Sequence, residues 1–344
     1  MTAAIHTGRR VSMSDPEGDQ HGTAGRLPRI AVIIPCYNEA LSIGTVVADF
    51  RRALPRAAIY VYDNNSTDRT IEAAREAGAI VRSETQQGKG HVVRRMFADV
   101  EADIYVLIDG DGTYDVASAP QLVDLLIEQG LDMVNAARQP IADKAFRPGH
   151  KFGNRLLSGV VGAIFGRSIS DMLSGYRILS RRFVKSFPLQ STGFEIETEM
   201  TVHVLELGMP IAEVTTPYRD RVSGSSSKLR TVHDGVRILL VIVRLLEQER
   251  PFQFFLCFSA ILALMSLGLG APVLVEYWNT GLVPRLPTAV LSAAIMILAF
   301  LSFASGLILA TVTNGRREAK RLRYLSCLSP AAMNFRTGPP DAKG

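Results

Sequence analysis

The stretch that decides the fold is Ile104-Tyr-Val-Leu-Ile-Asp-Gly-Asp-Gly-Thr-Tyr114, in which an apolar run ends at two aspartates separated by a glycine. An apolar run without alternation is typical of a strand that is buried on both faces. Two carboxylates directly after it offer hard oxygen donors, which suit Mg²⁺ or Mn²⁺ when phosphate oxygens complete the ligand shell. The motif therefore predicts a divalent-ion site at Asp109 and Asp111, at the end of a buried strand.

Two upstream segments repeat this arrangement of an apolar run followed by polar residues. Residues 30–34 precede Pro35-Cys-Tyr-Asn-Glu39, and residues 58–62 precede Asp63-Asn-Asn-Ser-Thr-Asp68. Helices are expected at 39–54, 66–78, 90–100 and 122–129, and further strands at 80–81 and 133–137. This alternation predicts an α/β fold with a Rossmann-like, mostly parallel sheet and helices on both faces. The carboxyl ends of such strands share one edge, so the acidic residues of the three motifs should converge there.

The composition excludes several classes of protein. The chain has 344 residues, of which 47% are apolar and 21% charged, so it has ample material for a packed core. A net charge of +5, without basic residues interleaved with stacking aromatics, does not indicate a nucleic-acid partner. Three scattered cysteines form neither a disulfide framework nor a metal motif. Residues 1–28 are polar, lack the apolar run of a signal peptide, and are expected to form a disordered tail.

Two long runs without charge lie in the last third of the chain. Residues 252–275 and 286–315 each exceed the roughly 20 residues that a helix needs to span a bilayer. Basic residues flank the pair on the outer sides, so the positive-inside rule places both flanks in the cytoplasm. We therefore expect a two-helix transmembrane hairpin at 252–313 in the cell (inner) membrane. The α/β domain at 29–227, a basic tail at 314–344 and both termini would then be cytoplasmic.

Residues 228–250 have the pattern of an amphipathic helix. Apolar residues recur at three- and four-residue spacing from Leu229 to Leu246, with charged residues on the opposite side. Such a helix either lies among the lipid headgroups or docks on the core of the preceding domain, and the sequence leaves both readings open. Residues 151–165 are a second, weaker candidate for an interface helix.

Basic and hydroxyl residues gather in the second half of the α/β domain. Arg138 follows a predicted strand, Ser174 precedes a Gly-Tyr-Arg sequence, and the run that ends at Lys228 carries Arg221 and Ser227. Arginine side chains and backbone N–H groups fit a phosphate group. The alternative for the run before Lys228 is a solvated loop that touches anionic headgroups in general.

The motifs resemble, in this order, those of family 2 glycosyltransferases with the GT-A fold. They are Pro35 to Glu39, Asp63 to Asp68, Asp109 to Asp111, Ser174 to Tyr176, and the run from Asp220 to Leu229. The resemblance covers about residues 29–250 and is nearest to dolichol-phosphate mannose synthases and bacterial polyprenyl-phosphate glycosyltransferases with a C-terminal membrane hairpin. It implies inverting transfer of a hexose from a nucleotide diphosphate sugar to polyprenyl phosphate, with Mg²⁺ or Mn²⁺ as cofactor.

The resemblance also implies a role for individual residues. The nucleotide sugar would be bound by Pro35, Tyr37, Glu39, Asp63, Lys89, Asp109 and Asp111. The acceptor phosphate would be bound by Arg138, Ser174, Arg221, Ser227 and Lys228. The catalytic set would be Asp109, Asp111, Arg138, Arg221 and Lys228, with Asp109 and Asp111 as the metal ligands. Lys89, in Gly88-Lys-Gly90, is outside any phosphate-binding P-loop motif, and the alternative for it is an ordinary solvated lysine.

Two observations bear on the substrate. Thr113 stands where related mannose synthases often have a glutamine metal ligand, so UDP-glucose or UDP-N-acetylhexosamine is expected, with GDP-mannose as the alternative donor. Glu195 and Glu199 share one face of a predicted helix, where one of them orients a sugar hydroxyl or both are solvated. The acceptor phosphate needs no general base, because its second pKa near 6 leaves it largely anionic at about pH 7.

Other functions fit the sequence less well. A non-enzymatic, membrane-anchored subunit that binds nucleotide sugars would be expected to have a damaged metal motif, whereas Asp109 and Asp111 are both present. A processive polysaccharide synthase would carry a QxxRW-type motif, but the single tryptophan, Trp278, lies in the expected hairpin turn. Small membrane hairpins often associate, so the sequence leaves open whether the chain forms a homo-oligomer.

Overall fold

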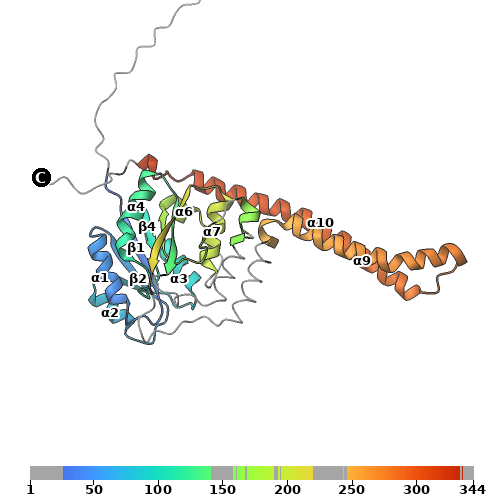
Figure 1. The fold of residues 1–344 in the computed structure, drawn as a ribbon, viewed down its shortest axis with the longest axis horizontal. Helices are drawn as coiled ribbons and strands as arrows, with labels where there is room; N and C mark the ends of the chain where they lie inside the picture. Colours follow the sequence, from blue (N-terminus) through green and yellow to red (C-terminus); the bar gives the residue numbers. More distant parts are fainter. Residues whose placement is uncertain are drawn as a thin grey trace, which may run out of the picture.

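The computed structural model describes residues 26–140, 158–159, 161–166, 169–189, 193, 195–219, 243, 246–333 and 335. An α/β domain lies at one end, and two long helices project from it as a hairpin (Figure 1). Several predictions lie outside the described residues. These are most of the N-terminal tail, most of the amphipathic helix at 228–250, the loop with Arg221, Ser227 and Lys228, and residues 336–344.

The sheet has seven strands in the order β3-β2-β1-β4-β6-β5-β7. Their bounds are β1 Ile30–Cys36, β2 Ala58–Asp63, β3 Ile80–Ser83, β4 Ile104–Leu107, β5 Met133–Pro140, β6 Arg177–Ser180 and β7 Ile211–Tyr218. Strand β6 runs antiparallel to its neighbours β4 and β5, and the other four pairs are parallel. The predicted mostly parallel sheet is therefore confirmed.

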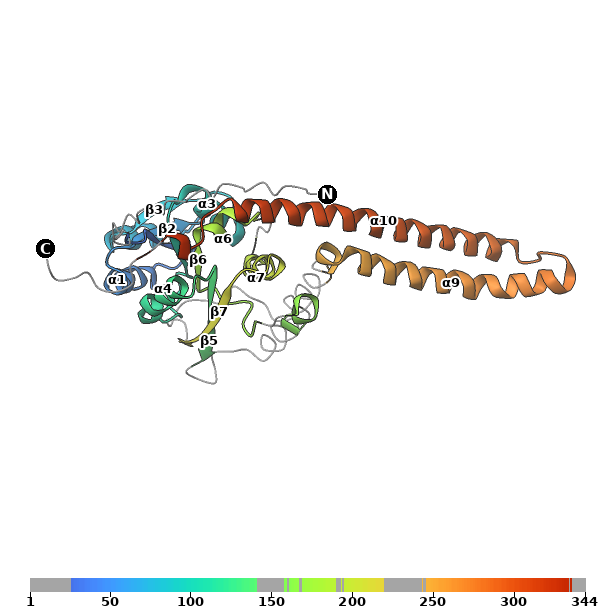
Figure 2. The same ribbon diagram turned by 90° about the horizontal axis from the view of Figure 1, so that it is seen from above.

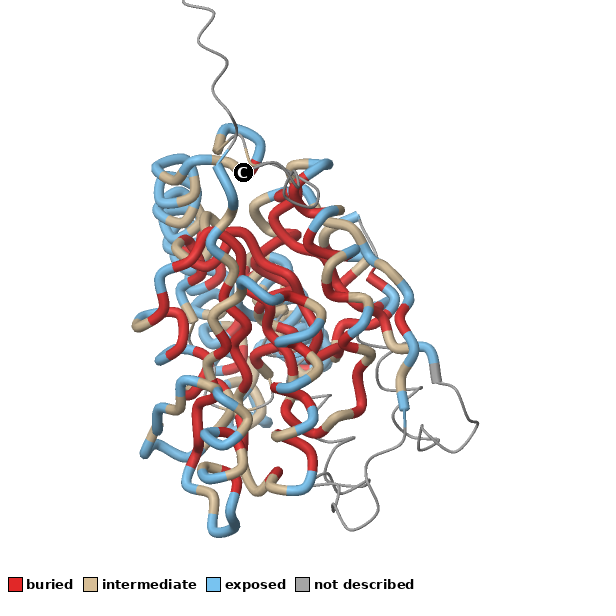
Figure 3. The backbone as a smooth tube through the Cα atoms, turned by 90° about the vertical axis from the view of Figure 1, so that its left-hand side faces the viewer, coloured by how far each residue is buried: buried red, intermediate tan, exposed pale blue. Residues whose placement is uncertain are grey.

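Helices cover both faces of the sheet. Helices α1 (Ile43–Ala53) and α4 (Ala119–Glu128) pack on one face. Helices α3 (Lys89–Asp99), α6 (Arg181–Ser186) and α7 (Ile196–Glu206) pack on the other. Successive strand residues point to opposite faces, so in β1 Ile33 joins one core cluster and Val32 and Ile34 join the other. Both faces need apolar side chains, which is why the strands lack alternation. Figure 3 shows the buried residues concentrated in this domain.

Two helices begin later than the sequence predicted. The segment expected to be helical from Glu39 becomes α1 only at Ile43, because the backbone N–H groups of Ser42 and Ile43 both donate to the Glu39 carbonyl in a turn. The segment expected from Ser66 becomes α2 only at Thr70 (Thr70–Glu76), because residues 63–68 form hydrogen bonds to neighbouring loops. In both cases the polar residues after a strand form a loop before the helix begins.

The two uncharged runs form α9 (Pro251–Thr280) and α10 (Leu286–Leu325), which lie side by side and are joined by residues 281–285 (Figures 1 and 2). Both helices are long and apolar enough to cross a membrane, and 6% and 17% of their most apolar windows are buried. A core helix of a soluble protein would be mostly buried, so these helices indicate membrane association. Helix α10 continues past its apolar part and runs back along the α/β domain (Figure 2).

Candidate active site

The strand register brings the predicted acidic residues to the carboxyl edge of the sheet. Cys36 at the end of β1 pairs with Asp63 at the end of β2. Asp109 follows β4 at the same edge, where the Ile108 N–H donates to the Ile33 carbonyl. The antiparallel β6 begins at this edge, because Arg177 pairs with Leu107. The turn before β6 is thereby placed against Asp109.

Asp63 is a buried carboxylate at the end of β2. Its side chain is buried, and its Oδ2 accepts a hydrogen bond from the Ser66 backbone N–H at 3.1 Å. Its Oδ1 is buried without a hydrogen-bond partner among the described residues. Such an orphaned acceptor costs free energy unless a ligand supplies a donor. Glu39 is also buried nearby on the β1–α1 turn, whereas Pro35 and Tyr37 are half-buried.

Asn64 fixes the loop that precedes Lys89. Its Nδ2 donates to the carbonyls of Glu84 and Gln86, at 2.9 and 2.8 Å. Its Oδ1 accepts from the Gly88 N–H at 2.7 Å. The side chain is buried and makes three hydrogen bonds, so it holds the backbone of the 84–88 loop in one place.

Lys89 lies between two carboxylates on opposite sides of the site. Its Nζ donates to Asp109 Oδ1 and to Glu197 Oε1 on α7, both at 2.5 Å. Burial alone would lower the pKa of Lys89, but the two negative charges outweigh it and raise this pKa above its usual range. Burial raises the pKa of Glu197 in spite of the opposing charge of Lys89. Glu197 Oε2 has no hydrogen-bond partner among the described residues.

Thr113 and Gly175 shape the aspartate pair. The Thr113 hydroxyl and N–H donate to Asp111 Oδ1 at 2.6 and 3.1 Å, so this threonine orients Asp111. A Cβ atom added to Gly175 would lie 2.1 Å from Asp109 Oδ2, so only glycine allows the backbone to approach the carboxylate this closely. The Gly175 N–H donates to the Tyr114 hydroxyl at 2.7 Å, which holds the turn in place.

The site fits a divalent ion only with help from a ligand. In the part of the chain that the structure describes, no three His, Cys, Asp or Glu side chains gather as a metal site. Asp109 and Asp111 are hard oxygen donors on one tight turn, and the lack of a side chain at Gly175 lets the Asp109 carboxylate occupy its position. An ion held by these two aspartates would take its remaining ligands from water or from the phosphates of a bound nucleotide.

Arg138 and Ser174 are held by internal partners. The Nε and Nη2 atoms of Arg138 donate to the two Asp171 oxygens at 2.7 and 2.8 Å, and this arginine lies 5.6 Å from the centre of the Tyr218 ring. Burial raises the pKa of Asp171, but Arg138 outweighs it and holds this pKa below its usual range. Ser174 is buried, and its hydroxyl donates to the Ala136 carbonyl at 2.6 Å. The acceptor-binding roles of Arg138 and Ser174 stay predictions.

Sequence reasoning missed two residues of this site. It considered Glu195 and Glu199 as neighbours on a helix, whereas the structure buries Glu197 against Lys89 and leaves the other two half-buried. It also treated residues 63–68 as the polar segment after a strand, and did not identify Asn64 as the residue that holds the neighbouring loop. In both cases the partner belongs to another loop, so local spacing carried no signal.

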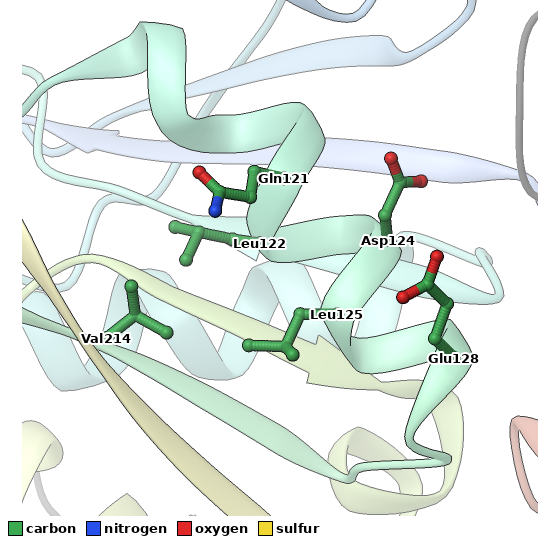
Figure 4. Close-up of a pocket in the computed structure, with 6 residues that line it drawn as sticks. All are labelled: Gln121, Leu122, Asp124, Leu125, Glu128 and Val214. Atoms are coloured by element: carbon green, nitrogen blue, oxygen red, sulfur yellow. The ribbon is translucent and has the colours of Figure 1, made fainter.

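A separate hollow lies between α4 and β7 (Figure 4). It is lined by Gln121, Leu122, Asp124, Leu125, Glu128 and Val214. None of the predicted site residues lines it. Burial and the nearby Glu128 raise the pKa of Asp124, one of the two acids that line it.

An α/β sheet of this order, with paired aspartates after its fourth strand, has the arrangement of a GT-A type glycosyltransferase. Residues 31–187 match the model of glycosyl transferase family 2. Glycosyltransferase AglJ of Haloferax volcanii is 36% identical over 272 residues, which are 77% of this chain and 87% of that protein. A dolichyl-phosphate hexose transferase of the same organism is 30% identical over 64% of this chain and 95% of its own length.

The fold of a solved enzyme is similar as well. Glucosyl-3-phosphoglycerate synthase from Mycobacterium tuberculosis, in complex with Mn²⁺ and UDP-glucose, is 25% identical to this chain, with a TM-score of 0.52. The match covers 64% of this chain and 78% of that enzyme. The chain belongs to glycosyltransferase family 2, which confirms the resemblance seen in the sequence. It is a glycosyltransferase and not a non-enzymatic subunit.

Proposed function

We propose that this enzyme transfers a hexose, with inversion, from UDP-glucose or a UDP-N-acetylhexosamine to polyprenyl phosphate at the cytoplasmic face of the membrane. The observation that carries the proposal is that one continuous helix, α10, joins an apolar hairpin to the α/β domain that holds the carboxylate edge. An enzyme built in this way has its site close to a bilayer, where the acceptor would be a lipid. The name of the dolichyl-phosphate hexose transferase supports the same acceptor class.

The donor half of the site would be built from the β1, β2 and β4 loops. Pro35, Tyr37 and Glu39 would contact the nucleoside. The open Oδ1 of Asp63 would accept a hydrogen bond from a base N–H or a ribose hydroxyl. Asp109 and Asp111 would hold Mg²⁺ or Mn²⁺, which supplies positive charge that stabilises the leaving diphosphate. Lys89 would share that task, because its ammonium already lies at Asp109.

The open Oε2 of Glu197 would accept a hydrogen bond from a sugar hydroxyl, because it is a buried acceptor next to the aspartate pair. The acceptor phosphate is already anionic near neutral pH, so its attack on the anomeric carbon needs positioning and not deprotonation. We assign its binding to Arg138 and Ser174 together with Arg221, Ser227 and Lys228. Arg138 would have to share its guanidinium between Asp171 and the phosphate.

The test uses the full-length protein in detergent with a panel of nucleotide sugars and undecaprenyl phosphate. We expect a glycosyl phosphoprenol and UDP with one UDP-sugar, dependence on a divalent ion, and loss of product for Asp111→Ala. Full activity after chelation of metal ions or in Asp111→Ala would remove the metal assignment. Transfer from GDP-mannose alone would overturn the donor, and transfer only to a non-lipid acceptor would overturn the acceptor.

We propose a membrane topology in which α9 and α10 both span and the α/β domain and both termini are cytoplasmic. A phosphatase fused at Asn279, near the turn of the hairpin, should be active because it lies outside the cytoplasm. A matched fusion after Leu325 should be inactive. Activity in the second fusion and not the first would reverse the orientation.

A further inference from the structure

Helix α10 does not end where its apolar part ends. Residues 286–315 carry no charge, yet the helix continues without a break to Leu325. The ten additional residues extend it by about 15 Å at 1.5 Å per residue. This extension contains five basic residues, which the sequence suggested would belong to a cytoplasmic tail. The structure packs the extension on the α/β domain, next to α6 (Figure 2).

The first half of the extension is held by Glu206, at the end of α7. The Glu206 side chain is 3% exposed. Its two oxygens accept from Arg317 Nε at 3.2 Å and from Lys320 Nζ at 2.6 Å. Arg317 also donates to the carboxylate of Glu249, just before α9, at 3.0 Å. A single arginine therefore ties together the domain, the segment before α9 and the extension of α10.

The second half is held by Asp132, which is fully buried immediately before β5. It accepts hydrogen bonds from Ser180 Oγ at 2.6 Å, from Arg182 Nε and Nη2 at 2.5 and 2.7 Å, and from the Tyr324 hydroxyl at 2.9 Å. The Arg182 guanidinium also lies 4.5 Å from the centre of the Tyr324 ring. The last turn of α10 is thus bound to a carboxylate whose two oxygens both accept hydrogen bonds. This carboxylate lies at the amino edge of the sheet, opposite the candidate active site.

We propose that Glu206 and Asp132, through Arg317, Lys320 and Tyr324, clamp α10 to the domain and thereby position the active site for the lipid acceptor. Two contacts along one stiff helix fix both the height and the rotation of the domain relative to the hairpin. The phosphate of a membrane lipid lies at a fixed depth relative to the bilayer surface. An active site held at the same depth binds this phosphate without the entropic cost of first orienting the domain. This inference rests on the proposed function, because it concerns the lipid acceptor.

The basic residues of the clamp differ from residues that attract anionic lipid headgroups in general. Arg317 and Lys320 are directed at buried carboxylates, whereas Arg321 and Arg323 on the same segment are exposed. The chain therefore offers a matched comparison, in which either pair of basic residues is neutralised by the same change. A clamp predicts that the two pairs differ, whereas attraction to anionic headgroups predicts that they behave alike.

The experiment compares the full-length wild type, a clamp variant (Arg317→Gln, Lys320→Gln and Tyr324→Phe) and a control variant (Arg321→Gln and Arg323→Gln) in nanodiscs. Each is assayed with undecaprenyl phosphate in the bilayer and with a short-chain, water-soluble prenyl phosphate. For the clamp variant we expect kcat/KM for the bilayer acceptor to fall about tenfold or more. Its donor KM and its kcat/KM for the soluble acceptor should stay within about twofold, as should every value of the control. Equal losses with both acceptors, or equal losses in both variants, would overturn the inference.

A distance measurement keeps the test independent of the enzymatic assay. Spin labels at Arg69→Cys on the domain and Trp278→Cys at the hairpin tip, with Cys257 and Cys327 replaced by serine, report the orientation of the two parts. The wild-type background and the control should give one narrow distance distribution, and the clamp variant a broad one. A broad distribution confined to the clamp variant, together with no lipid product from the wild type, would refute the proposed function and leave the clamp standing. A narrow distribution in the clamp variant would refute the clamp whatever the activity.

Discussion

Replacing Lys89 by methionine tests the charge arrangement at the centre of the site. The Nζ atom lies 2.5 Å from an oxygen of Asp109 and an oxygen of Glu197, so these two oxygens are no farther apart than twice that distance. Without the ammonium, two carboxylates at about 5 Å repel by roughly 3 kcal/mol at an effective dielectric constant of about 20. Loss of one partner from a buried ion pair typically costs about 3–5 kcal/mol. We therefore expect Lys89→Met to lower the free energy of unfolding by about 3 kcal/mol.

Thermal unfolding of the full-length protein in detergent measures this effect, with and without Mn²⁺. A loss of about 3 kcal/mol corresponds to a fall in Tm of roughly 6–12 °C for a domain of this size. Mn²⁺ should raise the Tm of Lys89→Met more than that of the wild type, because the ion replaces the missing positive charge at Asp109. The control is Lys185→Met, whose partner Glu101 is 53% exposed, and it should cost less than about 1 kcal/mol. An unchanged Tm in Lys89→Met, or an equal response of both proteins to Mn²⁺, would refute the reasoning.

Two further changes test the site and the core. Gly175→Ala should displace the Asp109 carboxylate and lower kcat/KM at least tenfold, with little change in Tm. The control is Gly159→Ala, whose added Cβ atom meets no atom within 4 Å, and it should leave kcat/KM and Tm unchanged. Full activity of Gly175→Ala would contradict the close packing of Gly175 on Asp109. Burial lowers the pKa of His203 to about 3, so the unfolded chain binds a proton below about pH 6.5 that the folded protein does not. His203 should therefore lower the free energy of unfolding as the pH decreases, by about 0.7 kcal/mol per pH unit near pH 6.5 and about 1.4 kcal/mol per pH unit near pH 5. In chemical unfolding of His203→Gln, the dependence of this free energy on pH should be shallower by these amounts.

The parts of the fold that the sequence predicted are those in which local pattern and tertiary environment coincide. The run Ile104 to Ile108 is apolar throughout because its residues alternate between two buried cores. The burial of this strand on both faces can therefore be predicted from its own residues, without knowledge of the elements that pack on it. The position of Asp109 and Asp111 followed from the end of that strand. The two long helices followed from the absence of charge over lengths that exceed a bilayer.

The parts that could not be predicted depend on pairs that are distant in sequence. Glu197 meets Lys89 across 108 residues, so helical spacing on α7 gave no reason to prefer it to Glu195 or Glu199. Arg317 and Lys320 lie in a segment that has the composition of a basic tail. Their partner Glu206 is 111 and 114 residues away in the sequence, so no local pattern indicated that this segment binds the domain. Charge patterns show which residues need a partner, but only the fold shows which partner is within reach.

The two edges of the sheet use buried carboxylates in opposite ways. At the amino edge, Asp103 accepts from Arg26 at 2.8 and 2.9 Å and from the Arg29 N–H, and Asp132 accepts from Ser180, Arg182 and Tyr324. At the carboxyl edge, Asp63 and Glu197 each keep one buried oxygen without a partner among the described residues. A saturated carboxylate stabilises the fold, whereas an open one costs free energy that a bound ligand can recover. The amino edge therefore contributes stability through carboxylates with complete sets of hydrogen bonds, one of which binds the last turn of α10, and the carboxyl edge keeps the two open acceptors to which we assign ligand binding.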